Sequence, residues 1–145
     1  MKTIEKSILI EAHKEKVWNV LLEDELNREW FSEFSAGSHA ETDWIEGHKV
    51  VFSDDSKRGI IGKIEAKQPY EYLSIAYDGL YDNGEEDFDS EEAQKVKGTF
   101  ERYYLSEENG HTRLKIESDM PEEHFEYMSK AWDKALEKIE SLSLT

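Results

Sequence analysis

The sequence contains no cysteine and only two prolines, Pro69 and Pro121, in 145 residues. Without cysteine the chain can form neither disulfides nor thiolate metal sites, and it has no cysteine nucleophile. No apolar run approaches the ~20 residues that a membrane-spanning helix needs. The first sixteen residues lack a continuous apolar segment and a small-residue cleavage site, so we expect no signal peptide and a cytoplasmic location.

Basic residues are also scarce. The chain has 18 Lys and Arg residues against 34 Asp and Glu residues, which gives a formal net charge of −16. Such a surface repels nucleic-acid phosphates and anionic lipid headgroups, so we expect neither nucleic acid nor a membrane as a partner. Aromatic residues, in contrast, make up 12% of this polar chain and are the first candidates for a binding role.

Known catalytic and nucleotide-binding motifs are missing. The sequence has no P-loop, no GxSxG and no GxGxxG. Its five histidines show no metal-ligand spacing, so we expect structural roles for them, and we assign no catalytic residue, metal or cofactor. The histidines are His13, His39, His48, His111 and His124.

The most acidic stretch is Asp82–Gln94, with seven carboxylates in thirteen residues. It lacks the alternating ligands and the fixed glycine of an EF-hand loop, which argues against calcium binding. Like charges at this density favour a solvated chain. We therefore predict a mobile loop here.

Hydrophobic periodicity predicts the remaining elements. Apolar residues alternate over Thr3–Ala12, which predicts a strand, and then take helical spacing in two short helices, Lys14–Leu22 and from Glu23 or Asp24 to Phe31. A hairpin is predicted around the turn Glu107–Gly110. The predicted strands after the two helices are Ser38–Asp43, His48–Ser53, Arg58–Lys67, Tyr70–Tyr77, Lys97–Ser106 and His111–Ser118.

A long amphipathic helix closes the chain. Ser118 or Asp119 can cap it, and Pro121 fits its first turn, where a missing N–H has no consequence. Its apolar stripe consists of Phe125, Met128, Trp132, Leu136, Ile139 and Leu142. We expect one domain, 1–145, of the α+β class. Six or seven antiparallel strands would curve around the C-terminal helix, with two short helices after the first strand.

The order and spacing of certain residues resemble the START-like (SRPBCC, helix-grip) superfamily. The chain is most similar to the branch named after the C-terminal domain of the activator of Hsp90 ATPase. The residues that carry the resemblance are Ile8–Ala12, Val17-Trp18, Glu29–Phe31, Gly62, Ile64, Pro69, Leu73, Tyr77, Gly110–Leu114 and Trp132. The full activator has a further N-terminal domain that this chain is too short to contain, so the resemblance does not imply co-chaperone activity.

The resemblance implies a cavity between the curved sheet and the last helix, where a small hydrophobic or aromatic molecule could bind. Superfamily members include carriers of lipids and hormones, aromatic cyclases and domains that contact other proteins. We expect the cavity beneath the hairpin at Pro69, with Trp30 and Phe31 closing one end. The candidate ligand-binding residues are Trp30, Phe31, Ile64, Leu73, Ile75, Tyr77, Glu101, Tyr103, Met128 and Trp132.

Strand parity predicts an unusual position for Glu101. Across the Glu107–Gly110 turn, Tyr103 and Leu105 share a face with the apolar residues of the next strand, and two residues further back Glu101 falls on that same face. A buried carboxylate must be paired, hydrated or protonated. Glu101 either reaches water at the open end of the sheet or serves as a polar anchor, or an acid or base, inside the pocket. Arg102 would then be exposed.

These observations favour a monomeric protein that binds a small hydrophobic or aromatic ligand. Two alternatives stay open. The first is an enzyme of the cyclase or hydratase type that uses the inward carboxylate. The second is an acidic, stress- or chaperone-related protein-interaction module, whose partner binding would be sensitive to salt.

Overall fold

The predicted strands and helices are present in the computed structural model, which describes residues 1–145. The first strand, β1 (Lys2–Ile10), buries Ile4 and Ile10. Helices α1 (Lys14–Leu22) and α2 (Asp24–Phe31) lie at the predicted positions. The other elements are β2 (His39–Glu41), β3 (Lys49–Ser53), β4 (Arg58–Gln68), β5 (Tyr72–Asp82), β6 (Glu85–Asp87), α3 (Glu91–Val96), β7 (Phe100–Glu108), β8 (His111–Met120), η1 (Glu122–His124) and α4 (Phe125–Ser143).

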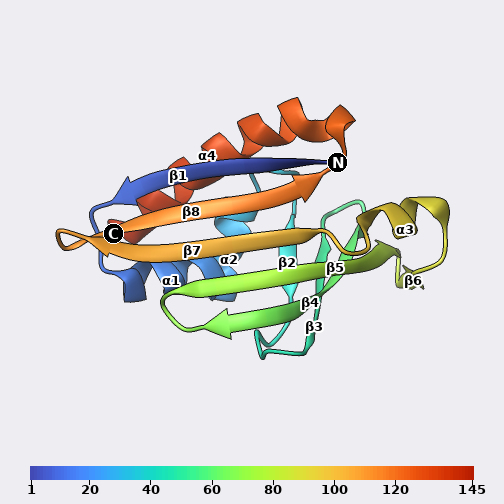
Figure 1. Ribbon diagram of the computed structural model, residues 1–145, viewed down its shortest axis with the longest axis horizontal. Helices are drawn as coiled ribbons and strands as arrows, with labels where there is room; N and C mark the ends of the chain where they lie inside the picture. Colours follow the sequence, from blue (N-terminus) through green and yellow to red (C-terminus); the bar gives the residue numbers. More distant parts are fainter.

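The sheet is antiparallel throughout, with the strand order β1-β8-β7-β5-β4-β3-β2, and the short β6 pairs with β5 off this path. Figure 1 shows the sheet curving so that β2 and β3 lie behind β7 and β5, on the side where α1, α2 and α4 lie. Each of these helices has one apolar face, and the curved sheet buries all three faces together. The predicted α+β fold class, with its curved sheet and long C-terminal helix, is confirmed.

Helix α4 supplies the main apolar stripe of the core. Trp132, Leu136 and Ile139 are buried, while Phe125 and Met128 at its beginning are only partly buried. The stripe packs against α1, α2 and β1. No helix in the structure has the combination of length and apolar character needed to cross a membrane.

The β7–β8 turn is tighter than predicted. Only Asn109 and Gly110 connect the two strands, and their φ angles of 53° and 84° are typical of the type I′ turn that Asn-Gly favours. A two-residue loop keeps the parity of a four-residue loop. Glu101 therefore faces inward as predicted and is buried. Arg102 faces outward but is half-buried, because its side chain lies over the ring of Phe100.

The prediction of a loop without regular structure at Asp82–Gln94 is wrong, because the segment contains β6 and the beginning of α3. Strand β6 forms a hairpin with the end of β5, through the turn at Asn83 and Gly84. Ser90 then caps α3, because its side chain accepts a hydrogen bond from the Ala93 N–H at 3.1 Å. Ala93 is fully buried against β5. The close approach of Asp87, at the end of β6, to β5 requires Gly79, since a Cβ there would lie 2.5 Å from the carbonyl oxygen of Asp87. The carboxylates project outward from an ordered segment, so their repulsion does not prevent it from folding.

We expect the amides of Ala93 and Gln94 in α3 to exchange slowly with solvent, because both donate to Ser90 and the helix packs on β5. Ala93→Asp should abolish this protection, since a carboxylate cannot stay unpaired at a fully buried position. Hydrogen exchange monitored by NMR measures both proteins, and the amides of α4 serve as the internal reference. Wild-type α3 amides that exchange as fast as those of an unstructured peptide would contradict the structure.

The C-terminal helix begins later than predicted. Strand β8 continues to Met120, and Pro121 precedes the short η1 turn instead of occupying the first turn of α4. Asp119 does not cap the helix. Its two carboxylate oxygens accept hydrogen bonds from the Thr3 hydroxyl at 2.6 Å and the Phe100 N–H at 2.9 Å. These bonds tie the end of β8 to β1 and β7, so pairing across the sheet outcompetes the local capping signal.

Candidate functional site

A cavity of about 230 Å³ lies between the first turns of α4 and one end of the curved sheet, where β8 ends and β7 begins. Exposed Met1 and Arg58 form part of its wall, so it opens to solvent. Its lining comes from the N-terminus, α2, the segment after α2, the sheet, the end of α3 and α4. The lining residues are Met1, Phe31, Phe34, Ser35, Ser38, Phe52, Ser53, Asp54, Arg58, Gly59, Ile60, Tyr77, Val96, Thr99, Glu101, Ser118, Asp119, Met120, Pro121, Met128 and Trp132.

Glu101 is the most buried charged residue of the cavity wall, with 6% of its surface exposed. Register places it opposite Ile75 of β5 and Ser118 of β8. The Tyr77 hydroxyl donates to Oε1 at 2.7 Å, and the Tyr103 hydroxyl donates to Oε2 at 2.6 Å. Both tyrosines are buried, so these two bonds form a polar network within the core.

Burial controls the protonation of this network. It raises the pKa of the Glu101 carboxyl above its ordinary value, and the hydrogen bonds from Tyr103 and Tyr77 only partly oppose this rise. Burial and the adjacent Glu101 charge raise the pKa of Tyr77 and of Tyr103 well above their ordinary value. The two phenols therefore stay protonated as donors, and Glu101 is the group of this network that can titrate.

The raised pKa predicts how stability depends on pH. Glu101 contributes most to stability below the pKa of the unfolded chain, near 4.5, and this contribution falls as the pH rises through the higher pKa of the folded protein. Glu101→Gln removes the titration but keeps the shape and polar character of the side chain. The free energy of unfolding of the wild type, minus that of the variant, should therefore decrease with rising pH across this window.

Urea unfolding of both proteins from pH 3 to pH 8 measures this difference, and subtraction cancels the titration of the many other carboxylates. A difference that increases with pH would show that the folded protein stabilises the charged carboxylate.

Aromatic rings form much of the remaining wall. Phe34 and Trp132 meet edge to face with ring centroids 4.9 Å apart, and Phe52 lies 6.2 Å from Tyr77. The indole Nε1–H of Trp132 is buried and has no hydrogen-bond acceptor. Buried donors in proteins are nearly always paired, so this unpaired N–H is an exception within the core beside the cavity.

Half of the ten predicted ligand-binding residues line the cavity and half do not. Those on the wall are Phe31, Tyr77, Glu101, Met128 and Trp132. The others are fully packed core residues: Trp30, Ile64, Leu73, Ile75 and Tyr103. Trp30 lies behind Phe31, stacked on it at 4.3 Å, and its indole N–H donates to the Val20 carbonyl. Tyr103 reaches the site only through its bond to Glu101.

Several wall residues escaped the sequence reasoning. Phe34 lies three residues beyond Phe31, after α2 has ended, and this helical spacing was a usable signal. Phe52 in β3 and Ser118 in β8 face inward. Alternation along each strand predicts that these side chains face the core, but it does not predict how far they lie from α4. Val96 ends α3, two residues beyond the acidic stretch Asp82–Gln94, and no helix was predicted there, so no signal placed it here.

The curved sheet, the gripping helix and the open cavity between them define the helix-grip class of proteins. A family model described as "Activator of Hsp90 ATPase homolog 1-like protein" matches residues 11–143. The chain belongs to this family, which confirms the resemblance inferred from the sequence. Its fold commonly binds hydrophobic ligands. A search of curated proteins finds no match.

Solved structures agree with the fold at low sequence identity. Protein MLL2253 from Mesorhizobium loti is similar with a TM-score of 0.73 and 19% identity, over 97% of this chain and 96% of that chain. The Aha1 dimer from Colwellia psychrerythraea has a TM-score of 0.73 and 15% identity, over 97% and 94%. CalU16 from Micromonospora echinospora has a TM-score of 0.65 and 20% identity, over 94% and 71%.

Proposed function

We propose that this protein binds a compact hydrophobic or aromatic molecule in the cavity between the sheet and α4. The observation that carries the proposal is the cavity itself, which is lined by aromatic and aliphatic side chains around a small number of polar groups. This composition is typical of small-molecule sites, where apolar burial supplies affinity and a few polar groups fix orientation. Its volume of about 230 Å³ is below the range for drug-sized ligands, so the guest is small.

The proposed site consists of the five predicted residues on the cavity wall together with neighbours that the sequence did not indicate. Phe31, Phe34 and Phe52 offer flat apolar surface, and Met128 offers a flexible side chain that can adapt to the shape of a guest. Glu101 supplies the buried polar group. Trp30, Ile64, Leu73, Ile75 and Tyr103 support this wall from behind and are left out of the proposed contact set.

A ligand screen by NMR tests the proposal. Members of a diverse apolar library that bind should shift the amides of Phe31, Phe52, Tyr77 and Met128 together, because these residues surround one cavity. Ser118→Phe should weaken such binding at least tenfold, since Ser118 is an inward-facing wall residue and a ring at this position occupies the space of the guest. Ser106→Phe, on the exposed face of β7, is the matched control and should leave binding unchanged.

Absence of any such cluster of shifts would contradict the ligand-binding proposal. The acidic protein-interaction module would then replace it, and its partner binding should weaken steeply with salt.

An enzyme of the cyclase or hydratase type is a second candidate, favoured by one observation. Glu101 is a carboxyl group on the wall of an apolar cavity, and burial raises its pKa, which suits a general acid. Under this alternative a compound found in the screen is slowly converted by the wild type. Glu101→Gln should then retain binding and lose turnover, whereas a pure carrier shows no turnover in either protein.

A further inference from the structure

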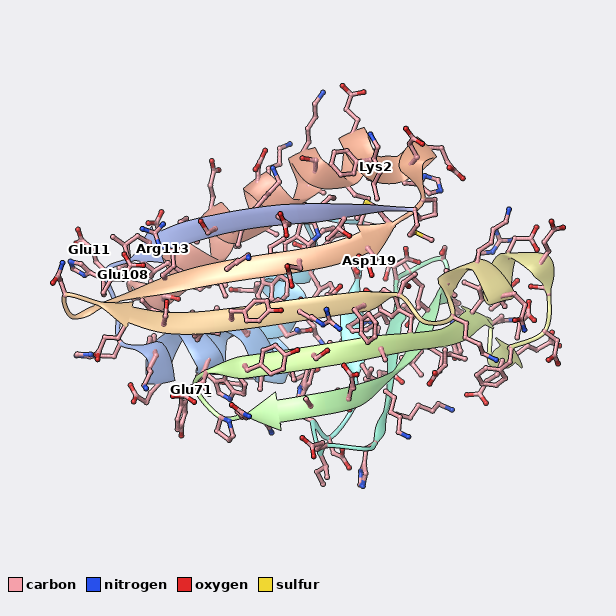
Figure 2. All side chains as sticks on the ribbon, viewed as in Figure 1. Lys2, Glu11, Glu71, Glu108, Arg113 and Asp119 are labelled. Atoms are coloured by element: carbon pink, nitrogen blue, oxygen red, sulfur yellow. The ribbon has the colours of Figure 1, made fainter.

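The cavity wall carries more negative than positive charge. Three carboxylates line it, from Asp54, Glu101 and Asp119, against the guanidinium of Arg58 and Met1, which carries the N-terminal ammonium group. Arg58 is exposed and its Nε lies 3.7 Å from the Asp82 carboxylate, so its charge is directed partly outward. Figure 2 shows Asp119 at the end of β8 beside the beginning of β7, far from the Glu108–Arg113 pair at the opposite end of these strands.

None of the three carboxylates forms a salt bridge in the structure. Asp119 accepts from a threonine hydroxyl and a backbone N–H, and Asp54 accepts from the hydroxyls of Ser35 and Ser56. Glu101 accepts only from two tyrosine hydroxyls. Each carboxylate oxygen can accept about two hydrogen bonds, so both oxygens of Glu101 keep capacity for a further donor.

The rest of the wall complements a cation that is attached to a ring. Faces of Phe, Tyr and Trp attract ammonium groups, and the cavity presents five such residues. The ring of an aromatic guest can pack against these same side chains. The ring of such a guest would thus contact the aromatic wall. Its charged nitrogen would find a carboxylate that forms no salt bridge within the protein.

We propose that the ligand is a compact aromatic amine, whose protonated nitrogen donates to Glu101 while its ring lies among the aromatic side chains. This inference rests on the proposed function, since it names the ligand class of the same cavity. It gives the acidic wall a role: negative charge there selects cations and disfavours carboxylates such as fatty acids. The ammonium–carboxylate bond is charge-assisted and is stronger inside an apolar cavity than in water.

Three probes with one ring system test the charge preference: naphthylmethylamine, naphthylmethanol and naphthoate. Titrations followed by NMR on the wild type should show the amine binding at least tenfold tighter than the alcohol, with the acid weakest. The Trp132 indole resonance should shift with the amine and with the alcohol, since both carry the ring. Glu101→Gln should reduce the preference for the amine over the alcohol to less than about threefold.

Glu65→Gln is the matched control. It removes one negative charge from an exposed position of β4 outside the cavity and should leave the preference intact. Equal binding of amine and alcohol to the wild type at the cavity would overturn the amine assignment and leave the ligand-binding proposal standing. Failure of all three probes to shift the cavity residues would also overturn the assignment, and the library screen would then decide separately whether the cavity binds any guest.

Discussion

Trp132→Ala should lower the free energy of unfolding by about 3–5 kcal/mol, the usual loss for truncating a buried tryptophan. Only 1% of the Trp132 surface is exposed, and its ring lies within 6.1 Å of the rings of Trp30, Phe34 and Tyr103. These neighbours come from α2, from the segment after it and from the sheet. The truncation therefore removes contacts between three parts of the fold at once.

Chemical denaturation measures the loss, with two comparison variants. Trp132→Phe keeps a ring and should lose less than Trp132→Ala. Lys134→Ala, two residues along α4 on its exposed face, should change stability by less than about 0.5 kcal/mol. A loss below about 1 kcal/mol for Trp132→Ala would show that the sheet does not hold α4 through this residue.

Glu101→Leu should lower the free energy of unfolding by about 2–4 kcal/mol, because it leaves the hydroxyls of Tyr77 and Tyr103 without an acceptor. A buried polar group that loses its partner costs about 1–3 kcal/mol. The same principle predicts a rescue. The triple variant Glu101→Leu, Tyr77→Phe, Tyr103→Phe removes the orphaned hydroxyls and should recover most of the loss.

Denaturation of the single, double and triple variants gives the coupling energy among the three side chains. Tyr104→Phe is the matched control, since its hydroxyl donates to Glu117 at 2.6 Å from a less buried position on the other face of β7. It should have little effect. A triple variant no more stable than Glu101→Leu would show that the tyrosine hydroxyls find other acceptors, such as water in the cavity.

The order of the elements could be predicted from the sequence because it depends on local periodicity. Alternation gave β1, and helical spacing gave α1 and α2 almost to the residue. Parity across the Asn109-Gly110 turn placed Glu101 inside, even though the turn is shorter than expected. A side chain's face depends only on counting by two along a strand, so an error in loop length of two residues leaves it unchanged.

The acidic segment shows where local signals failed. Charge density alone predicted a solvated loop, but Ser90 caps α3 and Gly79 lets the segment approach β5 closely. The glycine lies eleven residues before the cap and in a different element. A contact between residues this far apart in the sequence leaves no local sequence pattern. The acidic residues alone therefore did not indicate that packing on β5 offsets their charge repulsion.

The sequence by itself determined which residues face the core, because face follows from periodicity. It also indicated the family and the inward orientation of Glu101, while the burial of this side chain became clear only from the structure. Only the tertiary structure decided which core residues line the cavity: Phe31, Tyr77 and Trp132 line it, while Leu73 and Ile75 pack tightly. The difference depends on the distance between α4 and each part of the curved sheet. That distance depends on the curvature of the sheet and on the residues between the end of β8 at Met120 and the beginning of α4 at Phe125. Both result from the packing of several elements, so no single stretch of the sequence predicts them.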